Sequence, residues 1–458
     1  MATTYLHRTT TSTGSNTTAT FSGWVKRATT GTRHVVWAGW ESSTERMVCG
    51  FESTDRLQMQ IYTGGTAYDI ETNRLFRDVG AWYHLVFQFD TSNASEPERF
   101  KMWVNGVQET SFNIDDTITQ DIEMKMWGST SQETIVGARK NSGYEHYFDG
   151  EMSNVHIIDG TVYAPTEFGE TDATSGIWKF KNPSGLTYGT NGTFLLDNGA
   201  VTTDSSSNSN NYSTGGTLTA TQDNPSNNFV TMNPLYNWDT WGSTLTNGNT
   251  TILNTTANKG RPATLGIQKG KWYWEVKNVS GGLQTVGIVS ESAISDADLN
   301  DGDIANGFQG YGGNRALGFC YESGQLVLAA STTLGWGSAV GTGDIVQVAV
   351  DLDNSKLYFG INGTWQNSGD PTSGSTGTGA ASITSYTGSP PVGEILWFPL
   401  YHSYDTSASS SFNFGNGYFG TTAVSTSESD DAGIGSFEYD VPTGYYALCT
   451  KNIKAYGG

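Results

Sequence analysis

Two pairs of acidic residues lie one residue apart in this 458-residue chain, and they come nearest to a catalytic pair of carboxylates. They are Asp149 with Glu151, and Glu438 with Asp440. Alternate residues of a strand share a face, and a retaining glycoside hydrolase needs two carboxyl groups about 5 Å apart. The first pair spans a turn glycine, and the second runs into Pro442 without a third acid. We expect neither pair to be catalytic and predict no enzyme.

The acidic stretch 296–303, DADLNDGD, is the nearest approach to a calcium loop. Oxygen ligands at alternate positions suit Ca²⁺, but Asp301 stands where an EF-hand needs Gly, and Gly307 where it needs a bidentate Glu. We interpret the stretch as a solvated acidic loop, and the sequence leaves calcium binding open. The six histidines are scattered singly. No metal or cofactor is expected.

Exposed aromatic residues in loops can stack on the apolar faces of sugar rings, while Asn, Asp and Gly groups bond the hydroxyls. Several loops of the second half of the chain carry such residues, although most aromatics of a β-protein are core. The candidate ligand-binding residues are Trp238, Trp241, Tyr311, Asn314, Trp336, Trp365, Tyr401, His402, Tyr404 and Asp405.

The strands that must position these residues are most evident at 343–370. Val346, Val348 and Val350 alternate with other residues, as in a half-buried strand. Asn362-Gly363 and, far upstream, Asn105-Gly106 each stand between apolar runs. This dipeptide favours a hairpin turn whose two central residues have positive φ. We predict two β-sandwiches with such a hairpin in each.

Composition supports an all-β protein of two domains, because Gly is plentiful and 56 residues are aromatic, whereas helix-period segments are few. The net charge of −21 argues against nucleic acid and anionic lipid as partners. Cys49, Cys320 and Cys449 are widely spaced, which favours free thiols. The start of the chain has no apolar signal segment, and no run reaches a membrane span, so we expect a protein made in the cytoplasm without membrane insertion.

Short strands about ten residues apart are typical of a sandwich, and the first half of the chain shows this spacing. The predicted strands cover 20–27, 34–38, 46–52, 57–62, 82–90, 100–104, 133–138 and 147–158. Within them, TFSGWVKR, FRDVGAWYHLVFQFDT, FKMWVNGVQ and YFDGEMSNVHIIDG resemble the laminin-G-like, concanavalin A-like lectin/glucanase domain common in marine bacteriophage proteins. The resemblance covers about 3–181 and implies a jelly-roll sandwich at 1–181. The acidic pattern of the enzymes of that family is absent from it.

Residues 182–235 are rich in Ser and Asn, too polar to fold alone. We expect an ordered connector that lies against its neighbours and whose apolar residues, around Phe194 and Phe229, supply surface for oligomer contacts. The segment DNPSNNF…MNPL resembles connectors of marine phage proteins.

The second half contains GKWYWEV, GYGG, GDIVQVAVDLDNSKLYFGINGTW, ILWFPLY and FNFGN in this order. Together they resemble a SPRY domain of the B30.2 type over about 236–450, and we place that domain at 236–458. In KWYWEVK, Trp272, Trp274 and Val276 are predicted to share the buried face. The resemblance implies partner binding through loops at one end of the sandwich, near Trp365, Tyr401 and Tyr404.

These resemblances lead to the hypothesis of a non-enzymatic bacteriophage virion protein: a fibre, knob or appendage subunit that adheres to a host surface through glycans. We expect a homo-oligomer, with a trimer favoured, and other virion proteins as partners. The alternatives are a capsid decoration or tail component that binds only virion neighbours, and a polysaccharide depolymerase. The sequence leaves open whether the protein belongs to the head or the tail.

Overall fold

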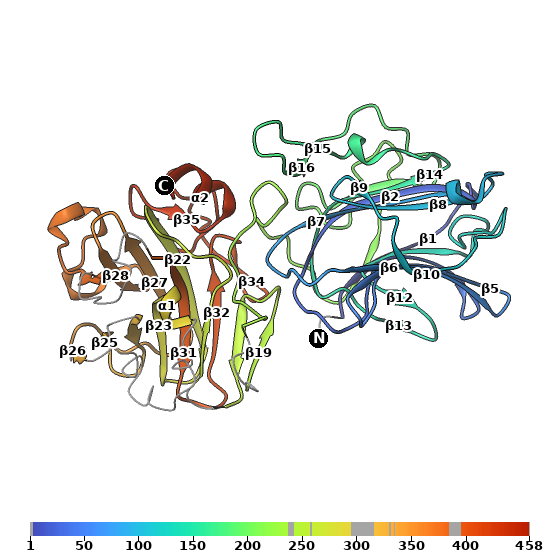
Figure 1. Ribbon diagram of the computed structural model, residues 1–458. Helices are drawn as coiled ribbons and strands as arrows, with labels where there is room; N and C mark the ends of the chain where they lie inside the picture. The colour runs from blue at the N-terminus through green and yellow to red at the C-terminus, as the bar shows by residue number, and fades with distance from the viewer. Residues whose placement is uncertain are drawn as a thin grey trace. The chain divides into compact units, whose positions relative to one another are not determined.

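The computed structural model describes residues 3–236, 242–256, 259–294, 316–328, 331–333, 335–383 and 395–457. The chain forms two compact units, Met1–Ala220 with Asn224–Ser226 and Thr221–Asp223 with Asn227–Gly458, and each is described by itself (Figure 1). The all-β prediction is confirmed, because the described α-helices are the short α1 (Glu291–Ile294) and α2 (Thr450–Tyr456). No helix in the described part of the chain is long and apolar enough to cross a membrane.

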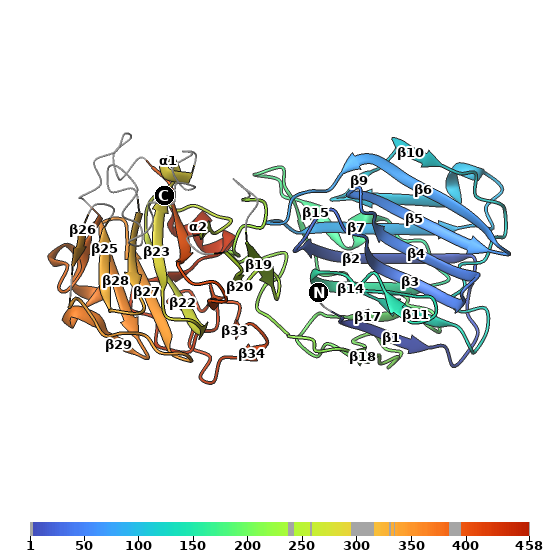
Figure 2. The same ribbon diagram turned by 90° about the horizontal axis from the view of Figure 1, so that it is seen from below.

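The first unit consists of two antiparallel sheets and two small hairpins (Figure 2). In spatial order the larger sheet is β10 (Phe112–Asp115), β6 (Thr66–Leu75), β5 (Arg56–Thr63), β4 (Glu45–Phe51), β3 (His34–Ser42), β11 (Glu133–Val136), β1 (Tyr5–Thr9) and β18 (Ser213–Gly215). The smaller sheet is β17 (Thr193–Leu195), β14 (Gly150–Asp159), β2 (Thr18–Arg27), β7 (Tyr83–Asp90), β8 (Phe100–Val104) and β9 (Val107–Gln108). The hairpins are β12 (Arg139–Lys140) with β13 (Tyr144–Glu145), and β15 (Gly169–Thr171) with β16 (Trp178–Phe180).

The two sheets of the first unit pack face to face around an aromatic core. Phe21 on β2 stacks on Trp37 of β3 with ring centroids 4.9 Å apart, so the contact joins one sheet to the other. Phe89 on β7 meets the same tryptophan edge to face at 5.9 Å. These alternating inward side chains form the core that the strand pattern predicts. The predicted turn is also present, with φ of 49° at Asn105 and 76° at Gly106.

The segment predicted as a connector at 182–235 is divided between the units. Residues up to Ala220 belong to the first unit, where β17 pairs with β14 and β18 pairs with β1. The polar tract folds because Asp204 accepts backbone N–H groups from Phe194, Ser206 and Asn210 at 2.7–2.9 Å. Its ordering therefore comes from turn hydrogen bonds and strand pairing as well as from apolar burial.

The second unit contains two further sheets. The larger is β19 (Ser243–Thr246), β20 (Thr251–Asn254), β32 (Ser409–Asn413), β22 (Lys271–Ser280), β27 (Ile345–Asp351), β28 (Lys356–Ile361) and β29 (Thr364–Trp365), with β30 (Ala381–Ser382) beside β28 and β35 (Tyr446–Ala447) parallel to β22. The other is β21 (Lys259–Pro262), β31 (Trp397–Ser403), β23 (Gln284–Ser290), β24 (Ala316–Cys320), β25 (Gln325–Leu328) and β26 (Ser331–Thr333). A hairpin joins β33 (Tyr418–Phe419) to β34 (Thr422–Ala423).

Both faces of β22 are buried from Trp272 to Val276. Trp272, Trp274 and Val276 lie in the main core, as predicted, and that core continues across to the other sheet where Phe319 stacks on Phe359 at 5.4 Å. The opposite face, which carries Tyr273, belongs to a second apolar cluster formed with residues near the end of the chain. Because both faces are covered, this strand lies inside three layers.

The first and last segments of the second unit pair with each other. The N–H of Val230 donates to the carbonyl of Leu448, and the N–H of Thr450 donates to the carbonyl of Asn228. An antiparallel bridge joins Phe229 to Cys449. Phe229 is 1% exposed, so the expectation that it supplies oligomer surface is wrong: its ring belongs to the second cluster.

Candidate functional site

Four of the predicted ligand-binding residues lie outside the described residues. They are Trp238, Trp241, Tyr311 and Asn314, and the acidic stretch 296–303 also lies outside the described part.

Three other predicted recognition residues are buried, which corrects the expectation that they face a ligand. Trp336 is 7% exposed and packs edge to face on Phe319 and Phe359. Tyr401 is 0% exposed, and its hydroxyl donates to Oε1 of Gln284 at 2.9 Å. His402 is 1% exposed, and burial lowers its pKa to about 3, so that the ring is neutral at pH 7. Tyr401 and His402 are on β31, an interior strand of its sheet, and Trp336 is in a loop that packs on the core. Aromatic type alone does not distinguish core from surface.

The remaining predicted residues are half-buried and hold local structure. Trp365 packs against the second apolar cluster, and Tyr404 meets His402 edge to face at 5.3 Å. Asp405 accepts the backbone N–H groups of Gly282 and Leu283 at 3.3 and 3.1 Å, so its carboxylate ties two loops together. The described residues of the predicted set do not converge on one site.

The acidic pairs are engaged with neighbouring groups. The Asp149 carboxylate accepts from the Thr29 hydroxyl at 3.2 Å, and burial raises its pKa. The Glu438 carboxylate accepts the backbone N–H of Ser425 at 2.7 Å and also the Ser425 hydroxyl. The carboxylates of Asp149 and Glu438 therefore each contact a neighbouring loop or strand.

A serine–histidine pair in the first unit has the wrong proton arrangement for nucleophilic catalysis. His84 Nε2 lies 2.9 Å from the Ser22 hydroxyl oxygen, and its Nδ1 accepts from the indole N–H of Trp178 at 3.0 Å. An indole N–H only donates, so Nδ1 must be the bare nitrogen and Nε2 must carry the proton. The imidazole therefore donates to Ser22 instead of accepting its proton, and full burial lowers the His84 pKa to about 3.

A polar groove with two phenyl rings lies in the first unit. We call it the phenylalanine groove; its volume is about 410 Å³, and it is lined by Ser153, Asn154, Phe180, Asn182, Phe194, Asp197, Asn224, Pro225 and Ser226. A register shift in β14 after Ser153, with a φ of 51° at Asn154, turns the strand there. The N–H of Asn154 donates to the carbonyl of Leu196 at 2.9 Å, which fixes the groove wall. β17 contributes Phe194 and the end of β16 contributes Phe180.

The Phe194 ring of the phenylalanine groove stacks on an uncharged histidine. The Phe194 ring stacks on the His156 imidazole at 4.0 Å and 15°, and His156 Nδ1 lies 2.8 Å from the Tyr188 hydroxyl. Burial lowers the pKa of His156 to about 3, so the stack is neutral at pH 7. One oxygen of Asp197 accepts from the Ser205 hydroxyl at 2.8 Å, and this carboxylate is the charged group of the lining.

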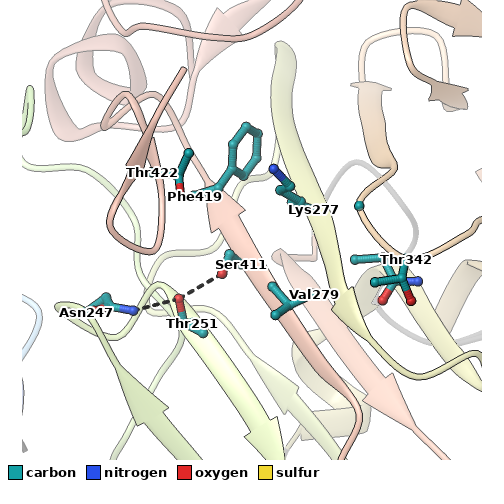
Figure 3. A pocket seen from close by; sticks show the side chains of 10 residues that line it. Asn247, Thr251, Lys277, Val279, Thr342, Ser411, Phe419 and Thr422 are labelled. Carbon is teal, nitrogen blue, oxygen red and sulfur yellow. Dashed lines mark hydrogen bonds between the residues drawn. The ribbon is translucent and has the colours of Figure 1, made fainter. Parts of the chain in front are cut away.

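A second groove lies on the larger sheet of the second unit (Figure 3). We call it the lysine groove; its volume is about 320 Å³, and it is lined by Asn247, Thr251, Lys277, Asn278, Val279, Thr342, Gly343, Ser411, Phe419 and Thr422. Figure 3 shows Phe419 and Thr422 on one side, Thr342 on the other, and hydrogen bonds linking Asn247, Thr251 and Ser411.

Sequence reasoning missed both grooves. It named Phe194 as an apolar residue of the connector, but it assigned none of the lining residues to a binding site. A Ser, Thr or Asn side chain has no pattern of its own, and these residues come together only through strand register. No group of three or more His, Cys, Asp or Glu side chains suited to a metal occurs in the part of the chain that the structure describes.

Comparison with known families assigns both units. Residues 2–165 match the model of the concanavalin A-like lectin/glucanases superfamily, and residues 271–377 match the model of the SPRY domain.

Similar solved structures include the SPRY domain of human HERC1 (14% identity, 37% of this chain and 91% of that chain, TM-score 0.27) and the PSpry domain of TRIM65 (13%, 40% and 91%, 0.29). A heptameric SAP-like pentraxin from Limulus polyphemus is also similar (13%, 35% and 72%, 0.27). The family models, rather than these structures, identify the units. The protein thus joins a concanavalin A-like domain to a SPRY domain, a combination that fits a binding role.

Proposed function

We propose that this protein is a non-catalytic adhesion protein that binds a glycan in the phenylalanine groove. The observation that carries the proposal is the lining itself, where two half-buried phenyl rings lie among side-chain amides, hydroxyls and one carboxylate. Aromatic rings accept the apolar C–H face of a sugar, and amides and carboxylates bond its hydroxyls, so this mixture suits a saccharide better than an apolar ligand.

The volume of the groove also favours a short saccharide. About 410 Å³ falls within the range of small-molecule sites and accommodates one or two sugar rings. The neutral stack of Phe194 on His156 supports the ring that the sugar would cover. The match of this unit to a superfamily that contains lectins agrees with the proposal.

We further propose that the adhesion protein is a bacteriophage virion component that contacts a host surface. The support is the sequence resemblance of the first unit, and of the segment DNPSNNF…MNPL, to marine bacteriophage proteins. Such a component takes the symmetry of the structure it decorates, so a homo-oligomer is expected, a trimer first. Labelling of this protein on purified particles, together with its mass in solution, tests the placement. A monomer both in solution and on the particle would contradict it.

Binding of the whole chain to an array of neutral glycans, with laminarin and agarose included, tests the groove. Phe194→Ala and Asn182→Ala are expected to weaken binding at least fivefold. Asn182 is exposed, so its replacement keeps the fold and separates lost contacts from unfolding. Val107→Ala is the matched control, because Val107 is 65% exposed in the same unit and does not line the groove.

The same samples test for catalysis. Released reducing ends from laminarin or agarose, lost on Asp149→Asn or Glu151→Gln, would overturn the non-catalytic part of the proposal. Absence of binding to every neutral glycan, or equal binding by Asn182→Ala, Phe194→Ala and the unchanged chain, would overturn the glycan site.

A further inference from the structure

The floor of the lysine groove is a row of three side chains on three neighbouring strands. Thr251 on β20 is directly opposite Ser411 on β32, and Ser411 is directly opposite Lys277 on β22. Side chains opposite each other in an antiparallel sheet have Cβ atoms about 5 Å apart. Two hydroxyls and an ammonium group are therefore aligned across the sheet.

The hydroxyl pair keeps one hydrogen for a ligand. Asn247 donates its amide hydrogen to the Thr251 hydroxyl oxygen at 3.1 Å, and that oxygen lies 2.9 Å from the Ser411 hydroxyl oxygen. Two hydroxyls carry two hydrogens, and their mutual bond uses only one. Among the hydrogen bonds of the described residues, the other hydrogen has no acceptor, whichever hydroxyl holds it. The row therefore presents a hydroxyl donor next to the ammonium group of Lys277.

The ammonium group of Lys277 has no carboxylate partner in the described part of the chain. Its nitrogen lies 5.9 Å from the centroid of the Phe419 ring, and Figure 3 shows it directed to that side of the groove. No lining residue is acidic. The adjacent Asp344 uses its oxygens on the backbone N–H of Gly341 and the amide of Asn362, both at 2.7 Å. Lys277 is therefore the charged side chain of the groove lining, in a chain whose net charge is −21.

We propose that the lysine groove binds an acidic saccharide through the carboxylate of a uronic acid. One ammonium and one hydroxyl donor match a singly charged carboxylate, whereas a phosphate dianion calls for a second cation. Val279 is 44% exposed and offers an apolar surface to the face of the sugar ring. The hydroxyls of Thr342 and Thr422, on opposite sides, suit the sugar hydroxyls. This site is separate from the phenylalanine groove and from the function proposed for it.

Calorimetric titration of the whole chain with trigalacturonate tests the proposal. The fully methyl-esterified trimer keeps the sugar hydroxyls and removes the charge, so it is expected to bind at least tenfold more weakly. Lys277→Met keeps the aliphatic stem and is expected to weaken trigalacturonate binding at least tenfold. Ser411→Ala is expected to weaken it several-fold. Lys454→Met is the matched control, because Lys454 is an exposed lysine outside the groove.

Four results would overturn the proposal. Equal binding of the acid and its ester, or equal binding by Lys277→Met and the unchanged chain, would show that Lys277 does not contact a sugar carboxylate. Hexaglutamate binding as tightly as trigalacturonate would show that the sugar rings contribute nothing to binding. Tighter binding of inorganic phosphate would show that the groove prefers phosphate to a carboxylate. Phe194→Ala is expected to leave trigalacturonate binding unchanged, so the two sites can fail independently.

Discussion

The buried carboxylate of Glu275 in the second unit accepts four hydrogen bonds. One oxygen accepts the N–H of Tyr439 and the hydroxyl of Tyr273, both at 2.9 Å. The other accepts the N–H of Glu438 at 2.9 Å and the amide of Asn413 at 3.3 Å. Because each oxygen meets a backbone donor, this side chain fastens the segment near residue 438 to β22.

Glu275→Gln is expected to destabilise the second unit by about 1–3 kcal/mol at pH 5, because one buried backbone N–H is left opposite the amide NH₂. Rotation of the amide does not help, since a backbone N–H faces either position. Chemical denaturation at pH 5 measures the loss. Glu322→Gln, at an exposed position, is the control and is expected to change the free energy of unfolding by less than about 0.5 kcal/mol.

The pH dependence of the same residue has a defined sign. Burial raises the Glu275 pKa from 4.5 to about 7. The folded state binds this proton more tightly than the unfolded state, so the contribution to stability is complete below pH 4.5 and is lost as pH rises through 7. The loss is at most on the order of 3 kcal/mol. The protonated carboxyl group can donate to Tyr273 and still accept on both oxygens, as an amide cannot.

The stability difference between the unchanged chain and Glu275→Gln should therefore be smaller at pH 8 than at pH 5. Denaturation at a series of pH values measures it. A difference that grows with pH would mean that the hydrogen bonds outweigh burial and that the carboxylate is ionised in the folded protein.

At the residue scale, the prediction was correct where the alternation of residue types along a strand decides which face forms the core. The alternation of Trp272, Trp274 and Val276 correctly gives the main core face. The burial of Glu275 on the other face was not predictable, because it depends on segments more than 130 residues away in sequence. Tyr401 and His402 failed as site predictions for a related reason: a local pattern does not show which further layer covers a strand.

At the scale of elements, the carboxylate of Asp204 accepts four hydrogen bonds within the tract from β17 to β18. Asp204 accepts the N–H groups of Phe194 and Ser206 on one oxygen, and the N–H of Asn210 and the hydroxyl of Ser206 on the other. This arrangement connects the edge strand of the smaller sheet to the polar loop. Because Phe194 also lines the phenylalanine groove, Asp204 stabilises both the polar loop and one side of the groove.

Asp204→Asn is expected to destabilise the first unit by about 1–3 kcal/mol, since the amide NH₂ must oppose a backbone N–H. It should also weaken glycan binding in the phenylalanine groove by loosening Phe194. Thermal unfolding and glycan binding measure the two effects. Asp115→Asn, at an exposed position of the same unit, should change neither. A stable Asp204→Asn variant would show that the loop does not depend on this carboxylate.

The strands that were predicted have clear alternation or a turn signal, and β2, β3, β4, β5, β7, β8, β11 and β14 are confirmed. The sequence of β6, TAYDIETNRL, has no such alternation, and β17 and β18 are three residues long. These elements depend on pairing with partners already in the sheet. They form strands because of hydrogen bonds to distant segments, and a local sequence pattern does not reveal these bonds.

At the scale of the whole molecule, each unit has its own core. A core substitution should therefore destabilise mainly the unit that carries it. Trp37→Ala removes a fully buried ring of the first unit and Trp274→Ala one of the second. Each is expected to cost about 3–5 kcal/mol in the unit that carries it. Calorimetry and hydrogen exchange read out by mass spectrometry assign the loss. Equal loss of protection in both units from either change would show that they unfold as one body.

The two grooves show the limit of sequence reading for the molecule as a whole. Thr251, Lys277 and Ser411 are separated by up to 160 residues, and only the register of β20, β32 and β22 aligns them. The fold class was predictable because strand alternation and turn signals recur many times along the chain. The two grooves were not predictable, because each depends on the pairing register of a few particular strands.

The pairing of the first and last segments of the second unit bears on how this protein carries mechanical load. If the protein is pulled through these two segments, the tension would act first on the bond between Thr450 and Asn228, then on that between Val230 and Leu448. The two hydrogen bonds would break one after the other, and not at the same time. Resistance to tension then depends on Phe229, whose ring must leave its cluster before the third layer peels away from β22.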